Sequence, residues 1–535
     1  MTIETRAAGS PLPDVDHEIA RFHELQAKLR GVWEGIQTSP HWEHTSVVVP
    51  SLSFDAEELS KIQGVSFYEE RLLFTLMRLR HPGAHVIYVT GQPIHPDIID
   101  YYLHLLVGVP ASHARKRLAL FCVYDASAKP LSRKICERPR LVERMRSWVG
   151  DPSRAYLTCF NSSVWERRLA NALGIPLNGL DPALLPHGTK TGSRRAFREA
   201  GVACAPGFED LHSLDEILDA LDELSRIRPG IRRAVLKLNE SFSGAGNATF
   251  TFPNPLPAKK SERRVQLAAA IEKIEWSSSA ENMEWYFRKF SEMGGVVEEF
   301  LEAPEVRSPS VQVRIHPDSS CEVLSSHEQL LGGRTGQVYL GCRFPAHDEY
   351  RERLQEAALA VARVLASKGV VSRLGIDFLT TRSPGEDWKV SAIEINLRMG
   401  GTTHPFMALQ FLTGGRLEPR TGLFYSPRGQ LKYYVATDGL SAPSYRGMLP
   451  EDLMEILSRH GLHFRPTTET GVLFHMIGAL SQFGKVGVTC FGNSPEEADQ
   501  IYRWTVETLD REMGAMGETG GHMETMLDHA LPVME

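Results

Sequence analysis

The chain has 535 residues, of which 42% are hydrophobic and 23% charged, and 59 basic against 66 acidic side chains give a formal net charge of −7. At roughly 150 residues per domain this length predicts about three to four domains, and the ordinary composition excludes a collagen-like repeat, a single coiled coil and a wholly disordered chain. Because the net charge provides no global basic field, we expect neither nucleic acid nor an anionic membrane as a partner.

The cysteine pattern and the N-terminal residues indicate the cellular compartment in which the protein is expected. The seven cysteines are scattered without a C-x-x-C pair, which argues against a disulfide framework or a zinc site. The first residues lack the basic-then-apolar pattern of a secretory signal. No apolar run approaches the roughly 18 residues that a membrane span needs. We therefore expect a cytoplasmic protein.

The first third of the chain alternates helical and β-branched segments. A helical segment is predicted at 16–36, within an N-terminal region 1–45. The predicted strands are 46–55, 84–90, 117–125 and 154–160, and helices are predicted between them at 56–80 and near 97–106. Strands that alternate with helices indicate a parallel sheet covered on both faces. Residues 46–180 are thus predicted to form a doubly wound α/β domain.

A segment rich in glycine and proline (173–193) predicts a domain junction. The elements expected after it are helices at 190–200 and 213–227, a strand at 234–239 and an exposed polar loop at 252–264. From 296 the expected elements are strands at 296–301, 310–315 and 321–326, a helix at 352–369, and strands at 373–381 and 390–398. This pattern favours an α+β arrangement. Residues 416–513 are predicted to form a further small α/β module, followed by a mobile tail (514–535).

Several common catalytic signatures are absent from the sequence. There is no G-x-x-x-x-G-K-[ST] phosphate loop, and no G-x-G-x-x-G follows the early strands. There is also no H-R-D or D-F-G pair, no G-x-S-x-G and no H-E-x-x-H. A less common arrangement must therefore carry the chemistry.

The strongest local signal is the strand V-S-A-I-E-I-N-L-R (390–398). Glu394 and Asn396 are two residues apart and project from one strand face, and Arg398 continues that face. The segment G-I-D-F places Asp377 on an expected antiparallel neighbour. Carboxylate and amide oxygens suit Mg²⁺, and an arginine can grip a phosphate or carboxylate with two hydrogen bonds. A solvated polar strand face is the alternative for E-x-N-x-R alone.

Two upstream segments offer further ligands for a polyanion. Lys237 lies in the apolar strand A-V-L-K-L-N, and the following S-F-S-G-A-G-N (241–247) could bring backbone N–H groups to phosphate oxygens. Lys190, at the start of a helix, is a weaker candidate. The segment V-V-E-E-F-L-E-A-P-E-V (296–306) could bind an adenine through its backbone and a ribose through a carboxylate. The alternative for Lys237 and the segment after it is an edge-strand lysine followed by an ordinary turn. The alternative for 296–306 is a charged linker.

Taken in order, these motifs resemble the ATP-grasp superfamily over residues 46 to about 415. The resemblance implies a Rossmann-like domain (46–180), two ATP-grasping subdomains (181–295 and 296–415) and a C-terminal α/β module (416–513). The segments 89–96, 327–337 (H-E-Q-L-L-G-G-R-T-G-Q) and 400–406 (G-G-T-T-H-P-F) are similar to carboxylate–amine ligases of the pheganomycin-type peptide ligase group.

The resemblance also implies roles for individual residues. Lys190 and Lys237 would bind the α- and β-phosphates of ATP, and Ser243, Gly244 and Gly246 would close over the triphosphate. Glu298 would meet the adenine amine, Leu301 would offer its backbone to the ring, and Glu305 would hold the ribose. Asp377, Glu394 and Asn396 would coordinate Mg²⁺, with Arg398 at the transferred phosphate and Lys237 also catalytic. The glycine loop is shorter than usual, and the usual second arginine of the Asp377 strand is not obvious, with Arg373 or Arg314 as candidates.

The expected activity is ATP-dependent formation of an amide or peptide bond between small-molecule carboxylate and amine substrates, through an acyl phosphate, with release of ADP and phosphate. One alternative is a kinase that phosphorylates a small molecule and stops there. Another is a nucleotide-binding regulatory protein without turnover, which the complete set of Asp377, Glu394 and Asn396 argues against. Self-association into a homo-oligomer is left open.

Overall fold

The computed structural model describes residues 15–54, 59, 62–240, 246–277, 282–332 and 338–514. The predicted tail 514–535 lies almost entirely outside these ranges. The described chain contains a four-stranded sheet, a five-stranded sheet, a nine-stranded sheet and one small two-stranded ribbon. Within the described ranges, no helix combines the length and the hydropathy that a bilayer crossing requires.

The first unit (residues 15–188) contains the predicted parallel sheet, in the order β3-β2-β1-β4. Its strands are β1 (His44–Val49), β2 (Ala84–Thr90), β3 (Leu118–Cys122) and β4 (Ala155–Cys159). Its helices are α1 (Val15–Gln26), α2 (Leu29–Thr38), η1 (Val65–Arg80), α4 (Pro96–His104), α5 (Ala111–Arg115), α6 (Leu131–Cys136), α7 (Pro139–Val149), η2 (Pro152–Arg154), α8 (Val164–Leu173) and η3 (Pro182–Gly188). All strand pairs are parallel, which confirms the doubly wound prediction.

Two helical predictions in this unit need correction. The stretch predicted as one helix at 16–36 is two helices, α1 and α2, separated by a turn. Of the helical stretch predicted at 56–80, the part from Val65 to Arg80 is a 3₁₀ helix that follows the left-handed Gly64 (φ 71°); Leu59 is helical, and residues 55–58, 60 and 61 lie outside the described residues. Apolar periodicity predicts a helical stretch well but does not locate a turn within it.

The five-stranded unit (residues 190–299) has the order β5-β9-β6-β7-β8, all antiparallel. Its elements are α9 (Lys190–Glu199), β5 (Gly207–Leu211), α10 (Leu214–Ile227), β6 (Arg233–Leu238), β7 (Asn247–Thr251), α11 (Lys260–Ile271), β8 (Glu275–Trp276), α12 (Met283–Met293) and β9 (Gly295–Glu299). A capping box between Ser213 and Glu216 starts α10.

The predicted exposed loop at 252–264 is partly wrong, because α11 begins at Lys260. The prolines of this segment end at Pro257, and the residues that follow favour a helix. Leu267 and Ile271, four residues apart, are buried against the sheet and so lie on one helix face. Tertiary packing therefore extends the helix into the charged stretch.

The nine-stranded unit (residues 305–512) continues past the predicted boundary at 415. Its strands are β10 (Glu305–Arg307), β11 (Pro309–Ile315), β12 (Cys321–Gly332), β13 (Val338–Phe344), β14 (Ser372–Arg382), β15 (Lys389–Asn396), β18 (Tyr433–Ser441), β19 (Gly471–His475) and β20 (Lys485–Gly492), with β16 (Arg416–Leu417) and β17 (Phe424–Tyr425) forming the ribbon. Its helices are α13 (Asp348–Ser367), α14 (Thr403–Thr413), η4 (Pro443–Tyr445), α15 (Pro450–His460), α16 (Ala479–Phe483) and α17 (Pro495–Glu512). Since β13 pairs with β18, residues 416–513 extend one sheet and do not build a separate one.

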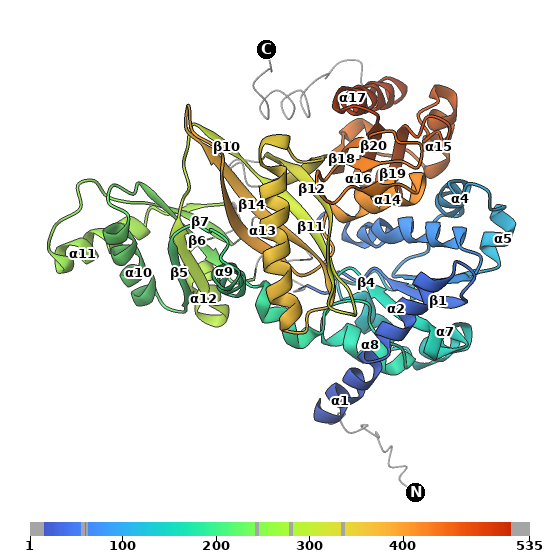
Figure 1. Cartoon of the computed structure of the whole chain (residues 1–535), viewed down its shortest axis with the longest axis horizontal. Helices are drawn as coiled ribbons and strands as arrows, with labels where there is room; N and C mark the ends of the chain where they lie inside the picture. The colour runs from blue at the N-terminus through green and yellow to red at the C-terminus, as the bar shows by residue number, and fades with distance from the viewer. Residues whose placement is uncertain are drawn as a thin grey trace, which may run out of the picture.

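Figure 1 shows how these units are arranged: the five-stranded unit forms one end of the molecule, and α13 crosses the nine-stranded sheet. Strand alternation divides that sheet into two faces, because Val311, Val313 and Ile376 pack with the apolar side of α13. The residues between them, such as Gln312 and Asp377, therefore face the other way. The C-terminal elements share a continuous apolar core with η1 and α4 of the first unit, beside which they lie in Figure 1.

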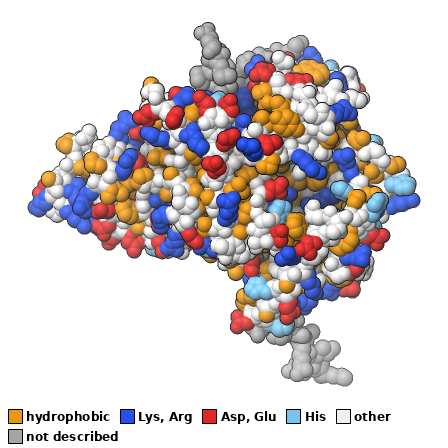
Figure 2. Space-filling model, in the orientation of Figure 1, with side chains coloured by type: hydrophobic (Ala, Val, Ile, Leu, Met, Phe, Trp, Pro, Cys, Tyr) orange, Lys and Arg blue, Asp and Glu red, His pale blue; other side chains and the backbone are white. Residues whose placement is uncertain are grey.

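The surface agrees with the modest net charge. Figure 2 shows acidic and basic side chains interspersed over the visible face, without one extended region of a single sign. This face therefore offers no broad basic surface to a polyanion.

Candidate functional site

A cleft of about 880 Å³ lies between the five-stranded and nine-stranded units. The sequence-predicted residues that line it are Lys190, Lys237, Glu298, Leu301, Asp377, Glu394, Asn396 and Arg398. They come from helix α9 and from strands of both sheets, or from the residues just after them. The structure thus brings together most of the residues selected from separate motifs.

The predicted metal ligands meet on two adjacent strands. Asp377 on β14 is the register partner of Glu394 on antiparallel β15, as predicted. The Asn396 side-chain amide donates to Asp377 Oδ2 (2.9 Å), and the Gln329 amide donates to Asp377 Oδ1 (2.9 Å). Asn396 therefore keeps its own amide oxygen available for a ligand.

The electrostatics of these carboxylates fit a divalent cation. Burial, together with the charge of Glu394, raises the pKa of Asp377 to about 7. Although burial alone would raise it, the pKa of Glu394 is lowered by Lys190 together with Arg398 and Lys237. Burial lowers the pKa of Arg398. Two half-buried carboxylates this close need additional positive charge, and their hard oxygens with the Asn396 amide oxygen suit Mg²⁺.

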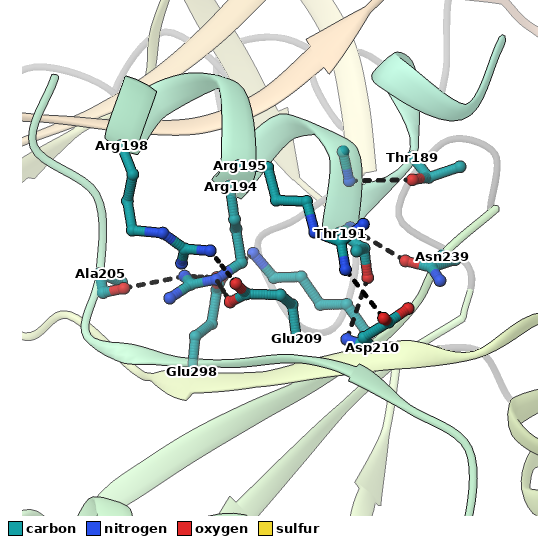
Figure 3. A network of polar contacts seen from close by, with 12 residues as sticks. Thr189, Thr191, Arg194, Arg195, Arg198, Ala205, Glu209, Asp210, Asn239 and Glu298 are labelled. Carbon is teal, nitrogen blue, oxygen red and sulfur yellow. Dashed lines mark hydrogen bonds and ion pairs between the residues drawn. The ribbon is translucent and has the colours of Figure 1, made fainter. Parts of the chain in front are cut away.

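Helix α9 positions Lys190 at its first turn, next to Thr189 and Thr191, which Figure 3 labels. Thr189 caps the helix by accepting from the Gly192 amide (3.0 Å), and Asn239, at the end of β6, accepts from the backbone amides of Lys190 (3.2 Å) and Thr191 (2.9 Å). Lys190, only 7% exposed, forms an ion pair with Glu394. Hydrogen bonds to Asn239 thus hold the start of α9 at the five-stranded sheet, while the Lys190 side chain contacts Glu394 of the nine-stranded sheet.

We predict that Gly192→Ala destabilises the protein. A methyl group at Gly192 would lie 2.0 Å from the Pro186 carbonyl oxygen, so α9 must shift, at a cost of about 2 kcal/mol in unfolding free energy. Gly31→Ala in α2 is the matched control, because it meets no atom within 4 Å and should stabilise by about 0.5 kcal/mol. Urea denaturation measures both, and equal effects of the two substitutions would contradict the packing at Gly192.

Glu298, predicted to meet the adenine amine, lines the cleft, and both of its carboxylate oxygens already have partners. One oxygen pairs with Lys237, and the other accepts from Arg194 Nη1 (3.0 Å). Arg194 also donates to the Ala205 carbonyl (2.8 Å) and to Glu209 (3.2 Å), as Figure 3 shows. In this geometry, Glu298 orients the Lys237 ammonium group. Sequence reasoning missed Arg194, although its place four residues after Lys190 puts both side chains on one helix face.

Other predicted residues lie elsewhere. Glu305, predicted to hold the ribose, is not among the cleft residues: it lies on edge strand β10, and its cross-strand partner Arg382 binds its carboxylate at 2.7 Å. Gly246, with φ 76°, closes the turn between β6 and β7, where its carbonyl accepts from the Leu238 amide (3.0 Å). Ser243 and Gly244 lie outside the described residues.

A buried polar cluster at the cleft wall was not predicted as a unit. Asp438 on β18 pairs with Arg71 of η1 through Oδ2, and its Oδ1 lies 2.8 Å from His475 Nε2 and 3.2 Å from His404 Nε2. Arg71 and Asp438 line the cleft. Arg71 lies more than 300 positions before the other three residues, which come from three different elements, so no local sequence motif predicts the cluster.

Comparison with known proteins assigns this fold and cleft to a class. Residues 184–283 and 277–420 match the family model described as "IQCH-like, ATP-grasp", which covers the motifs from Lys190 to Arg398. The chain belongs to the ATP-grasp superfamily. Within it, the chain is 30% identical over 467 residues to the L-propargylglycine–L-glutamate ligase of Streptantibioticus cattleyicolor, covering 86% of this chain and 92% of that one. It belongs with this enzyme to the pheganomycin-type peptide ligases, a group of carboxylate–amine ligases.

Further comparisons fit this assignment. Residues 452–505 match the model "PGM1 C-terminal domain". The IQ motif-containing protein H of Danio rerio is 22% identical over 77% of this chain and 42% of its own length. Among solved structures, a Campylobacter jejuni biotin carboxylase matches 89% of this chain and 95% of its own at 12% identity, with a TM-score of 0.49. The family assignment does not depend on so distant a structural likeness.

Proposed function

We propose that the protein is an ATP- and Mg²⁺-dependent ligase that joins a carboxylic acid to an amine and releases ADP and phosphate. The observation that carries this proposal is the convergence of Asp377, Glu394 and Asn396 with two lysines and Arg398 around one cleft. The relative named for joining L-propargylglycine to L-glutamate supports amino acids or peptides as the substrate class. Because the reaction consumes ATP, we also propose that it takes place in the cytoplasm.

The residues present fit the implied metal. Asp377, Glu394 and Asn396 would hold Mg²⁺, which when bound neutralises phosphate oxygens and favours their transfer. Lys190 and Lys237 would meet the phosphates of ATP. Each lysine already has a carboxylate partner, Glu394 or Glu298, so each ammonium group is oriented before the nucleotide arrives. The backbone of Leu301, directly after β9, would receive the adenine.

The chemistry follows from the poor reactivity of a carboxylate. Its charge repels nucleophiles, and transfer of the γ-phosphoryl group to one carboxylate oxygen gives an acyl phosphate with a good leaving group. The amine nitrogen then attacks the carbonyl carbon, the carbon–oxygen bond to phosphate breaks, and the nitrogen loses a proton. Arg398, next to the Asp377–Glu394 pair, would donate to the transferred phosphoryl group. Exclusion of water protects the acyl phosphate.

We predict that hydroxylamine traps the intermediate. The protein is incubated with ATP, Mg²⁺ and a panel of amino acids, with and without hydroxylamine, and both ADP and hydroxamate are measured. A ligase should form hydroxamate in proportion to ADP, because hydroxylamine replaces the amine. A stable phosphorylated product without any need for an amine would instead identify a small-molecule kinase and overturn the ligase proposal.

A further inference from the structure

A second cavity, of about 200 Å³, lies where the first unit meets the nine-stranded sheet. It has Phe160, Arg398 and Met399 in common with the cleft, so the two spaces adjoin at Arg398. One wall is apolar and comes from α2, through Leu29, Val32, Trp33 and Ile36. The lining also includes three arginines, Arg78, Arg314 and Arg373, and we call this cavity the arginine pocket.

The three guanidinium groups form no ion pair within 4 Å with a described carboxylate, although the charge of Glu322 acts on Arg314 and Arg373 from farther away. Arg78 donates to Ser46 Oγ (2.6 Å) and to the Tyr156 hydroxyl (3.2 Å), and Arg314, 6% exposed, donates to the Asn178 side chain. Arg373 Nη1 is buried without a hydrogen-bond partner. In the described part of the chain, the ion pairs within 4 Å include none of these arginines, in contrast to Lys190 and Lys237.

The register makes this arrangement costly in the free protein. Arg314 on β11 is the direct cross-strand partner of Arg373 on β14 on one side and of Glu322 on β12 on the other. Like charges directly opposite one another destabilise a sheet, and the single carboxylate of Glu322, whose side chain is 61% exposed, faces two arginines. Burial, followed by the charges of Arg373 and Arg78, lowers the pKa of Arg314 to about 9, and burial with the charge of Arg78 lowers that of Arg373 to about 10. Buried charges normally have a partner, so a bound anion would relieve this repulsion.

The pocket also has a defined relation to the reaction site. Arg373 and Asp377 are four residues apart on β14 and therefore project from the same sheet face. At about 3.4 Å per residue their Cα atoms lie about 14 Å apart, and both side chains extend into the space between the units. Two further lining residues, Thr158 and His316, each have a buried polar atom without a partner, Oγ1 and Nδ1.

We propose that the arginine pocket binds the non-reacting carboxylate of an amino-acid substrate. This inference depends on the proposed ligase function, because an amino acid that supplies only its amine keeps its own carboxylate throughout. Arg314 and Arg373 offer forked donors that match a carboxylate, and the α2 wall accommodates the apolar part of the ligand. The shared Arg398 lies between this anchored end and the phosphate-transfer site.

Binding to the nucleotide-free protein tests the proposal. The twenty protein amino acids are screened by thermal shift, and the strongest binder, its α-carboxamide and inorganic phosphate are then compared by calorimetry. We expect Arg314→Met and Arg373→Met each to weaken amino-acid binding by about tenfold or more, and the carboxamide to bind as weakly as the variants do. Arg140→Met, at an exposed position of α7, removes the same charge and should change nothing.

The melting temperature of the ligand-free variants distinguishes binding from a structural role. If the arginines serve a ligand, Arg314→Met should melt no lower than the parent protein because one of two facing charges is gone, whereas a structural arginine would lower the melting temperature. The proposal would be overturned if no amino acid binds, or if both variants bind the amino acid as the parent protein does. It would also be overturned if phosphate is the only ligand whose binding depends on Arg314. If hydroxamate forms but Arg314→Met does not change amino-acid binding, the pocket proposal is refuted and the ligase function stands. If amino-acid binding depends on the arginines but no hydroxamate forms, the ligase function is refuted and the pocket stands.

Discussion

Replacing Glu394 by glutamine is expected to lower ATP-dependent ADP release by about 10³-fold. The change keeps the size of the side chain but removes the charge that pairs with Lys190 and one of the three proposed Mg²⁺ ligands. Lys190 then lies buried without a carboxylate, and Asp377 loses its neighbouring charge. Steady-state ADP release with saturating ATP and Mg²⁺ measures the loss.

Glu386→Gln is the matched control for this experiment. Glu386 lies exposed in the turn between β14 and β15, where it pairs with Lys389, so it removes the same charge from the same hairpin without touching the cleft. We expect it to keep the parent rate. Circular dichroism checks that both variants are folded. Full ADP release by Glu394→Gln would refute the metal assignment, whatever the substrates are.

The sequence predicted those parts of the fold that local pattern controls. Strand β2 was located at its observed bounds, because a β-branched run between a Pro-Gly turn and a glycine leaves one interpretation. The pairing of Asp377 with Glu394 was also predictable, since two nearby strands joined by a short turn are antiparallel neighbours. By contrast, the continuity of β13 with β18 joins strands far apart in the sequence, and no local pattern encodes it.

The partners of the site residues were the hardest part to predict. Glu298 looked like a ligand for adenine, yet its oxygens pair with Lys237 and Arg194. That pairing depends on how α9 lies over the five-stranded sheet, which is a tertiary fact. From the sequence, the facing arginines Arg314 and Arg373 could be named only as candidates for one role that the family resemblance implies. Their register, with Glu322 as the other cross-strand neighbour of Arg314, emerged only with the sheet.

The same dependence on remote contacts makes Asp438 a sensitive position for stability. We expect Asp438→Asn to lower the free energy of unfolding by about 3 kcal/mol. Asp438, 8% exposed, holds the equally buried Arg71 and accepts from His475, so the change leaves a buried guanidinium without its counter-charge. Urea denaturation at pH 7 measures the loss, and Asp387→Asn, at an exposed turn position, is the control.

The pH dependence gives this prediction a second, independent test. Although burial alone would raise it, the pKa of Asp438 is held well below its ordinary value by Arg71, His404 and His475. A carboxylate with a lowered pKa in the folded state stabilises the protein above its unfolded pKa of about 3.9 and loses that contribution as the pH falls toward the folded value. The stability difference between the parent protein and Asp438→Asn should therefore stay constant between pH 5 and 8 and shrink below about pH 4. Equal stability at pH 7 would mean that the Arg71–Asp438 pair, which links the first unit to the nine-stranded sheet, contributes nothing in solution.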